Sequence, residues 1–261
     1  MRAMWSAAAG MSAQAYNMDT ISNNLANVNT SGFKKARAEF QDLLYQTVNL
    51  AGTASSVNTT LPTGIQLGHG ARLQAVVRQF TTGNMRHTEG DFDLAIEGKG
   101  FFQVTMPDGT IAYTRDGSFT KSNDGTLVTA SGYPLQPEIV IPQDALDVTV
   151  AMDGTVSVTQ PGQALPQEVG QITLVNFINP AGLNHIGSNL VLQTQASGDP
   201  IEGPPGADGI GTVKQGFLEM SNVDIADEMV NMIVGQRAYE ANSKTIRTID
   251  DMLSVVTNLK R

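Results

Sequence analysis

The stretch that decides the fold is the C-terminal segment 222–261, NVDIADEMVNMIVGQRAYEANSKTIRTIDDMLSVVTNLKR. Apolar residues recur along it at alternating steps of three and four, the spacing of an amphipathic helix, and no proline interrupts it. Acidic residues cluster near its start and basic residues close it, as the helix dipole favours. We therefore predict one helix over 222–261, roughly 60 Å long at about 1.5 Å per residue.

This predicted helix has two apolar stripes, about a third of a turn apart. Because one neighbour covers only one stripe, the helix should have at least two packing partners, and it is too long to be buried in a compact domain. Such a pattern is typical of assembly machinery. The residues that we assign to assembly on this helix are Ile225, Met229, Met232, Ile246, Ile249, Leu253 and Val256.

A second helix is predicted over Arg2–Val28, with a heptad-like seam rich in methionine and alanine. An ordinary amphipathic core helix is the alternative, but a long helix at the other terminus favours a coiled coil between the two ends. The larger residues of this seam, which we also assign to assembly, are Met4, Met11, Met18 and Leu25.

An asparagine-rich stretch, NNLANVNTSGFK over residues 23–34, should end this helix. Short amide side chains compete for backbone hydrogen bonds, and Gly32 can adopt the left-handed conformation that terminates a helix. Following a methionine- and alanine-rich helix, the stretch resembles the N-terminal signature of the bacterial flagellar rod and hook family of axial proteins. The motif residues are Asn23, Asn24, Asn27, Gly32, Phe33 and Lys34.

Three further stretches carry the resemblance. SNVDIADEMVNMIVGQRAYEANSKTI, from residue 221, is similar to the C-terminal signature of the family. EFQDLLYQTV and TTLPTGIQLGHGAR, over 39–48 and 59–72, are more similar to the distal rod branch than to the longer hook proteins. In that branch, the insertion after the DLLYQT segment is associated with a straight, stiff rod.

The middle of the chain reads as a β region. In Ala95–Leu135 three Asp-Gly pairs, at 108–109, 116–117 and 124–125, separate apolar runs, so we predict a hairpin turn with positive φ at each. This region resembles the core β segment that rod and hook proteins share. Upstream, the apolar residues of Ala36–Val48 fall on one helical face, and a polar loop is predicted over Ala51–Thr60.

The expected fold class is α+β, with long terminal helices forming a coiled-coil-like inner layer and a mainly antiparallel β middle. The resemblance implies three nested parts. Residues 1–30 and 222–261 form the inner assembly domain, 31–90 and 200–221 an intermediate domain with a rod-specific extension, and 91–199 an outer β domain.

Composition and motifs argue against several kinds of chemistry. With 16 basic and 25 acidic residues the net charge is -9, which disfavours nucleic acid, and no segment is apolar enough for direct membrane insertion. The chain has no cysteine, and His69, His87 and His185 stand singly in predicted loops without metal-ligand spacing. Asp91 and Asp93 read as a solvated face, and the lone Gly98-Lys99-Gly100 does not make a nucleotide loop. We expect no catalytic residues, cofactor or metal.

The resemblance implies a structural subunit of the flagellar distal rod, which polymerises into a straight helical tube and transmits torque from motor to hook. Implied partners are further copies of the chain, other rod subunits, the hook protein and the surrounding ring proteins. The expected location is the periplasm-spanning rod of the basal body, reached by export without a cleaved signal peptide. A proximal rod or hook subunit is the nearer alternative, and a secreted cell-wall glycan hydrolase the remote one.

Overall fold

The computed structural model describes residues 2–52, 54–56, 59–60, 62–162, 165–207 and 209–258. The chain divides into two compact units. The helical unit comprises Met1–Leu25, Ala36–Val77 and Asp224–Arg261, and the β unit comprises Ala26–Lys35 and Arg78–Val223.

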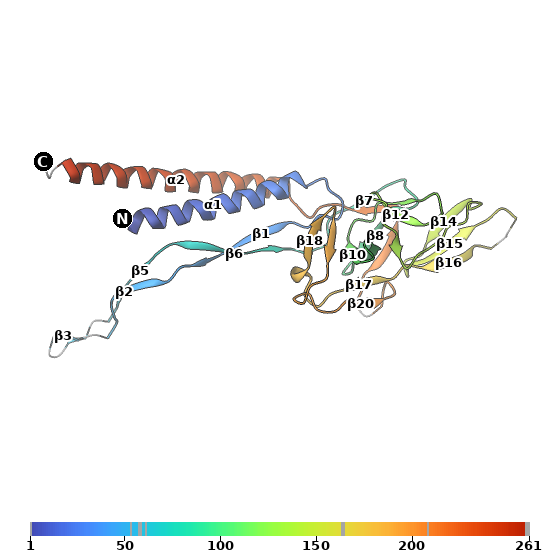
Figure 1. Ribbon diagram of the computed structural model, residues 1–261, viewed down its shortest axis with the longest axis horizontal. Coiled ribbons are helices and arrows are strands. Elements are labelled where there is room, and N and C mark those ends of the chain that lie inside the picture. Colours follow the sequence, from blue (N-terminus) through green and yellow to red (C-terminus); the bar gives the residue numbers. More distant parts are fainter. Residues whose placement is uncertain are drawn as a thin grey trace. The chain divides into compact units, whose positions relative to one another are not determined.

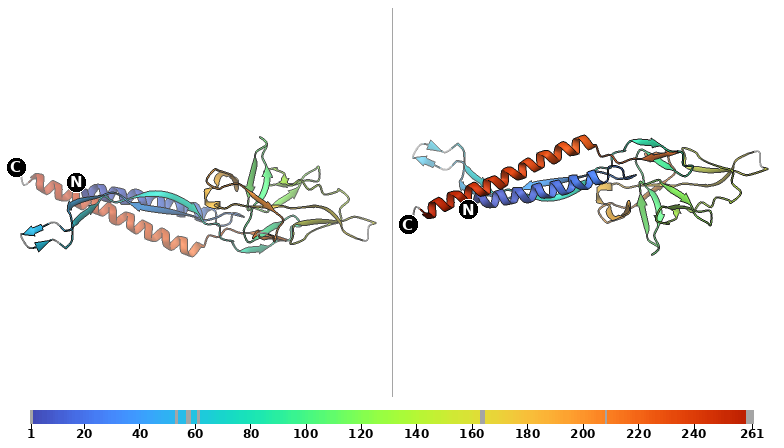
Figure 2. Two further views of the ribbon diagram at one scale, coloured as in Figure 1. Left: turned by 90° about the horizontal axis from the view of Figure 1, so that it is seen from below. Right: turned by 90° about the horizontal axis from the view of Figure 1, so that it is seen from above.

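The helical unit contains both long helices, α1 (Arg2–Ala26) and α2 (Ile225–Asn258), which lie side by side (Figures 1 and 2). Helix α2 begins three residues later than predicted because Asp224 caps it. The Asp224 Oδ1 atom accepts hydrogen bonds from the N–H groups of Ala226 at 2.8 Å and Asp227 at 3.3 Å. Residues 259–261 of the predicted helix lie outside the described residues.

The rest of the helical unit is a pair of chain segments that form antiparallel ribbons (Figure 1). Strand β1 (Ala36–Asp42) pairs with β6 (Ala71–Arg78), β2 (Tyr45–Asn49) with β5 (Ile65–Gly68), and β3 (Ala54–Ser56) with β4 (Thr59–Thr60). The predicted helical face over 36–48 is therefore wrong. The loop predicted over 51–60 is contradicted at 54–56 and 59–60, which are strands, whereas 51–52 form a turn and residues 53, 57 and 58 lie outside the described residues. Local periodicity misled over 36–48, because the backbone hydrogen bonds of β1 and β2 are made to partner strands that lie well outside the local window.

The β unit consists of short strands grouped in several small sheets. The largest has the order β13-β9-β10-β19-β18, and a three-stranded sheet has the order β14-β15-β16. Two-stranded pairings join β11 to β12, β17 to β20, β21 to β8 and β22 to β7. Their bounds are β7 (Met85–His87), β8 (Leu94–Glu97), β9 (Phe102–Thr105), β10 (Ile111–Thr114), β11 (Phe119–Lys121), β12 (Leu127–Thr129), β13 (Leu135–Gln136), β14 (Asp147–Val150), β15 (Thr155–Thr159), β16 (Gln167–Gln171), β17 (Leu174–Asn176), η1 (Pro180–Gly182), β18 (Asn184–Gly187), β19 (Leu190–Leu192), β20 (Ile201–Gly203), β21 (Thr212–Gln215) and β22 (Phe217–Glu219).

Two of the three predicted Asp-Gly hairpin turns are confirmed. Gly109 joins β9 to β10 with φ +81° and Gly125 joins β11 to β12 with φ +86°. The third prediction is wrong, because Gly117 does not have a positive φ. A Cβ at Gly117 would lie 1.6 Å from the Leu94 carbonyl oxygen, so glycine is required there for close backbone approach.

The β unit has its own hydrophobic core. Alternating residues of β8, β9 and β15 fill it, and Phe102 packs edge to face on Phe119 with ring centroids 5.2 Å apart. A second cluster gathers Phe101, Tyr113 and Phe177. The α+β class with a mainly antiparallel middle is thus confirmed. Among the described residues, no helix has the length and apolarity needed to span a membrane.

Candidate assembly surface

Helices α1 and α2 run antiparallel, and a glycine of each helix lies in their contact. A Cβ on Gly235 would lie 3.3 Å from Met18 Cγ, and one on Gly10 would lie 2.9 Å from Asn242 Nδ2. Near the other end of the contact, Asn24 Nδ2 donates to Glu228 Oε2 at 3.4 Å. Glycine and polar residues thus take part in the helix contact together with apolar residues such as Met18. The predicted coiled coil between them stays a prediction.

The covered side of α2 is a single narrow stripe. Most of its buried or half-buried members are spaced three or four residues apart, and they are Glu228, Met232, Gly235, Ala238, Asn242, Ile246 and Ile249. Ser243, next to Asn242, is also half-buried. This stripe combines members of both predicted stripes with polar residues and glycine. The contact with α1 therefore leaves most of the apolar surface of α2 uncovered.

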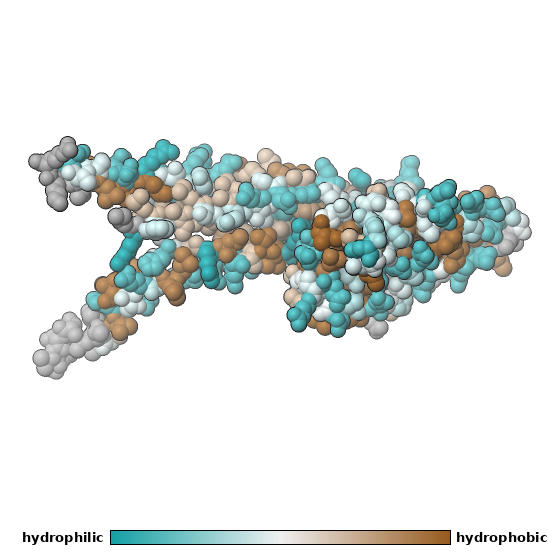
Figure 3. Space-filling model, viewed as in Figure 1, coloured by the Kyte–Doolittle hydropathy of each residue, from teal (hydrophilic) through white to brown (hydrophobic). Residues whose placement is uncertain are grey.

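The open side of α2 is strongly apolar. From the assigned assembly residues, Ile225, Met229 and Leu253 are exposed, and the side chain of Val256 lies outside the described residues. Their exposed apolar neighbours are Val230, Ile233, Val234, Tyr239, Met252 and Val255. The exposed fractions of Val230, Ile233 and Val234 are 59%, 55% and 62%. Figure 3 shows apolar residues on the visible surface of the helices and of the ribbon.

Helix α1 is better covered. The assigned seam residues Met4, Met11, Met18 and Leu25 are all half-buried, while the fully buried positions are Ala7, Ala13, Ile21 and Asn24. Trp5 is 75% exposed, and Tyr16, about three turns along the helix, is 52% exposed. The open side of α1 thus presents two aromatic rings.

The motif residue Asn24 has a structural role that its sequence context did not indicate. Its amide pairs with the backbone of Ala36, accepting from the N–H at 2.9 Å and donating to the C=O at 2.8 Å. The side chain thus acts as a strand partner at the start of β1. Of the other motif asparagines, Asn23 is exposed on α1, and Asn27 accepts a hydrogen bond from Thr30 Oγ1 at 3.2 Å.

The motif residues Gly32, Phe33 and Lys34 belong to the β unit. Gly32 has φ +68°, and its N–H donates to the Glu219 carbonyl at 2.8 Å. Phe33 is buried under the guanidinium of Arg78, which lies 5.1 Å from the ring centroid. The motif therefore fixes the chain where it leaves the N-terminal helix, as the predicted helix stop requires.

Lys34 anchors a buried ionic triad that sequence reasoning missed. Its Nζ contacts Glu219 Oε1 at 2.5 Å and donates to the Thr81 carbonyl at 2.7 Å, while Arg115 Nη1 donates to Glu219 Oε2 at 3.2 Å. All three side chains are buried. Burial lowers the pKa of Lys34, and the attraction of Glu219 opposes that shift. Glu219 and Arg115 gave no sequence signal, because each is a single charge at the end of a short strand.

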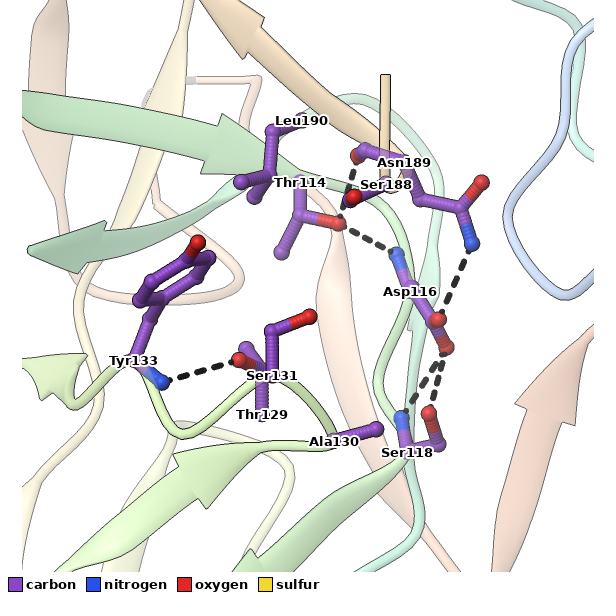
Figure 4. A pocket seen from close by; sticks show the side chains of 10 residues that line it. All are labelled: Thr114, Asp116, Ser118, Thr129, Ala130, Ser131, Tyr133, Ser188, Asn189 and Leu190. Carbon is purple, nitrogen blue, oxygen red and sulfur yellow. Dashed lines mark hydrogen bonds between the residues drawn. The ribbon is translucent and has the colours of Figure 1, made fainter. Parts of the chain in front are cut away.

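A hollow in the β unit is lined by ten residues, six of which carry a hydroxyl group (Figure 4). Its volume is about 240 Å³, and its walls include Ser118, Thr129 and Tyr133. The one carboxylate, Asp116, is occupied: it accepts hydrogen bonds from the N–H and Oγ of Ser118 and from Asn189 Nδ2. The hollow therefore holds no free charged group that would act on a substrate.

The described residues contain no group of three or more potential metal ligands. Two of the histidines predicted in loops lie in strands instead. His87 is in β7, edge to face with Phe217 at 5.1 Å, and His185 is in β18, where its ring stacks on Phe80 at 6.2 Å. Both histidine rings therefore pack against aromatic side chains of the β unit.

Comparison with known families identifies the class of protein. The N-terminal helix and motif match the family described as "Flagella basal body rod protein" over residues 4–34. Residues 95–158 match "Flagellar hook protein FlgE/F/G D1 domain", and 214–259 match "Flagellar basal body rod FlgEFG protein C-terminal". The three matches cover both helices and much of the β unit, so the resemblance seen in the sequence is confirmed.

Full-length relatives define the family more closely. The chain is 55% identical to the flagellar basal-body rod protein FlgG of Borreliella burgdorferi, over 100% of this chain and 99% of that one. It is 53% identical to FlgG of Buchnera aphidicola subsp. Schizaphis graminum over 98% of both chains, and 48% identical to FlgG of Caulobacter vibrioides over 100% of both. The chain belongs to the FlgG-like family of flagellar basal-body rod proteins, as a structural subunit of the distal rod and not an enzyme.

Proposed function

We propose that this chain polymerises into a straight helical tube that transmits torque from the motor to the hook. The observation that carries the proposal is the open apolar side of α2, which no other described part of the chain covers. A contact between two different surfaces of identical subunits does not close on itself and propagates as a helix. In this proposal, the open side of α2 is buried against further copies of the chain.

The charge distribution supports a layered tube. The β unit contains 16 acidic and 8 basic residues, a net charge of -8, whereas the helical unit is nearly neutral. Neutral, apolar helices can pack closely around an axis, while strongly charged units repel one another. We therefore retain the three nested layers that the family resemblance implies, with the terminal helices innermost and 91–199 outermost.

The proposed partners at the ends and sides of the tube are other rod subunits, the hook protein and the surrounding ring proteins. The straightness of the tube is proposed to depend on the segment 45–61. Exchanging this segment for that of a hook protein and measuring filament curvature by electron microscopy tests this dependence. Curved filaments after the exchange support it, whereas unchanged curvature contradicts a role of this segment in straightness.

The assembly surface is tested by the double substitution Val230→Ser and Val234→Ser. Burying the exposed half of each valine contributes about 1 kcal/mol, so the loss of both should raise the critical concentration for polymerisation by roughly thirtyfold. Sedimentation of polymer against total protein measures this concentration. Lys244→Ser, at an exposed polar position of the same helix, is the matched control and should change it little.

An unchanged critical concentration in the valine variant would contradict the proposal that the open side of α2 is part of the assembly surface. Circular dichroism in the far ultraviolet and near-ultraviolet signals from the β unit show whether the variant is folded, so a loss of assembly through misfolding is recognised separately.

A further inference from the structure

We propose that the β2–β5 ribbons of neighbouring copies pair edge to edge, so that successive subunits share one intermolecular antiparallel sheet. The proposal rests on the proposed function, because it requires a helical polymer of this chain. It assigns a binding surface and its occupant: β5 of one copy binds β2 of the next.

The first observation is the absence of charge. Residues 43–68, LLYQTVNLAGTASSVNTTLPTGIQLG, contain no Asp, Glu, Lys, Arg or His, although 16% of the chain is charged. Like charges on directly opposite strands destabilise a sheet. A segment that stacks against identical copies of itself therefore benefits from having none.

The second observation is exposure on both faces. Every residue of β2 and β5 is exposed, including Tyr45 at 55% and Leu67 at 43%. Tyr45 pairs with Gly68 and Gln46 with Leu67, so the tyrosine and the leucine point to opposite faces. A two-stranded hairpin without a buried face is marginal in water. The ribbon therefore needs further contacts for stability.

The third observation concerns the edges. Among the described residues, β2 and β5 pair only with each other, so each leaves one row of backbone N–H and C=O groups unpaired. Soluble proteins usually protect such edges with lysine, proline or bulges. Neither strand contains lysine or proline, and the one irregularity is the register shift between Thr47 and Asn49. The backbone groups on these edges are therefore available for hydrogen bonds to another strand.

Helical symmetry selects the pairing. All copies in a helical polymer point the same way along it, so the strand that comes to lie beside β5 is β2 of the next copy. Because β2 and β5 are antiparallel within a copy, the new pair is antiparallel as well. The resulting sheet has the order β2-β5-β2-β5, in which adjacent strands lie about 4.8 Å apart and equivalent strands about twice as far.

Disulfide mapping tests this arrangement, because the chain has no cysteine of its own. Tubes are assembled from equal mixtures of a β2 variant, Gln46→Cys or Thr47→Cys, and a β5 variant, Ile65→Cys, Gln66→Cys or Leu67→Cys, and are then oxidised. We expect crosslinks between the two variants with a period of two. A β5 position that crosslinks to residue 46 should crosslink at least about fivefold less to residue 47, since neighbouring side chains point to opposite faces.

Gln167→Cys, in the exposed edge strand β16, is the matched control partner for Gln46→Cys and sets the background. Tubes that form without β2–β5 crosslinks above this background overturn the proposal, as do crosslinks without alternation or dominant Gln46→Cys homodimers. Those results do not contradict the proposed function, because tubes have formed in each case. If the wild-type chain forms no tubes, the proposed function fails, and the ribbon pairing fails with it.

A second measurement covers the case in which the cysteine variants do not assemble. The amide I infrared spectrum of the wild-type chain should gain antiparallel β intensity when monomers become tubes, and a variant lacking residues 45–68 should lose that gain. A wild-type spectrum that does not change on assembly contradicts the shared sheet.

Discussion

At the scale of single residues, the family motif is chiefly a device for anchoring the chain. Asn24 completes the start of β1, Gly32 permits a backbone approach that a Cβ would block at 2.6 Å from the Asp116 nitrogen, and Lys34 enters the buried triad. A buried charge is tolerated only when it is paired and hydrogen-bonded. Glu219 is the centre of the network that holds Gly32 and Lys34, because its carbonyl accepts from the Gly32 N–H and its carboxylate pairs with Lys34 and Arg115.

Glu219→Gln should destabilise the β unit by about 3–5 kcal/mol, because it leaves two buried cations without their anion. Denaturant unfolding of the full chain measures the change. Glu97→Gln is the matched control: it breaks the partly exposed pair of Glu97 with Lys214 at 2.6 Å and should cost under about 1 kcal/mol. Equal costs for both variants would contradict a special role of the buried triad.

His185 should titrate unusually low. Although its strand is exposed, desolvation of the ring and then the charge of Arg78 lower its pKa from 6.5 to about 4. The folded state thus binds fewer protons than the unfolded state between these pH values. Stability should therefore fall as the pH falls from about 6.5 to about 4. NMR titration of the His185 ring checks this, and a midpoint near 6.5 would contradict it.

At the scale of elements, the strands set the boundary of the folding unit. The predicted outer domain 91–199 excludes β21, which pairs with β8, and β20, which pairs with β17. It also excludes Val213 and Ile210, which are buried in the main core. Strand partners from the C-terminal side of the chain are thus part of the β unit.

A fragment spanning 78–223 should fold alone and give dispersed NMR signals, because it retains these pairings and the core. The fragment 91–199 should give poorly dispersed signals or aggregate, since it exposes the edge of β8 and opens the core. A well-dispersed spectrum from 91–199 would show that the outer part of the β unit is stable without β20, β21 and β22.

At the scale of the whole molecule, the charge asymmetry should govern assembly. The β unit has a net charge of -8, so packing copies side by side opposes polymerisation electrostatically. Raising the ionic strength from about 0.01 M to about 0.15 M shortens the screening length from about 30 Å to about 8 Å. The critical concentration should therefore fall. Asp144→Asn with Glu168→Gln, both exposed, should weaken this salt dependence, and an unaltered dependence would contradict repulsion between β units.

The sequence by itself determined the features that depend on neighbouring residues. Both long helices follow from their periodicity, and the turns at Gly109 and Gly125 follow from local backbone chemistry. The short signatures at the two ends of the chain indicated the family, which the family matches over 4–34 and 214–259 confirm. In each case the determining interaction lies within a few residues of the chain.

Only the tertiary structure decided what depends on distant partners. Residues 36–48 fit a helical face, yet 36–42 and 45–48 are in strands, because β6 and β5, which lie well outside the local window, supply their strand partners. The triad unites Lys34, Arg115 and Glu219, which are far apart in the sequence and give no local signal. Gly235 and Asn242 lie on the covered side of α2 because α1 packs there, and no pattern within α2 selects that side.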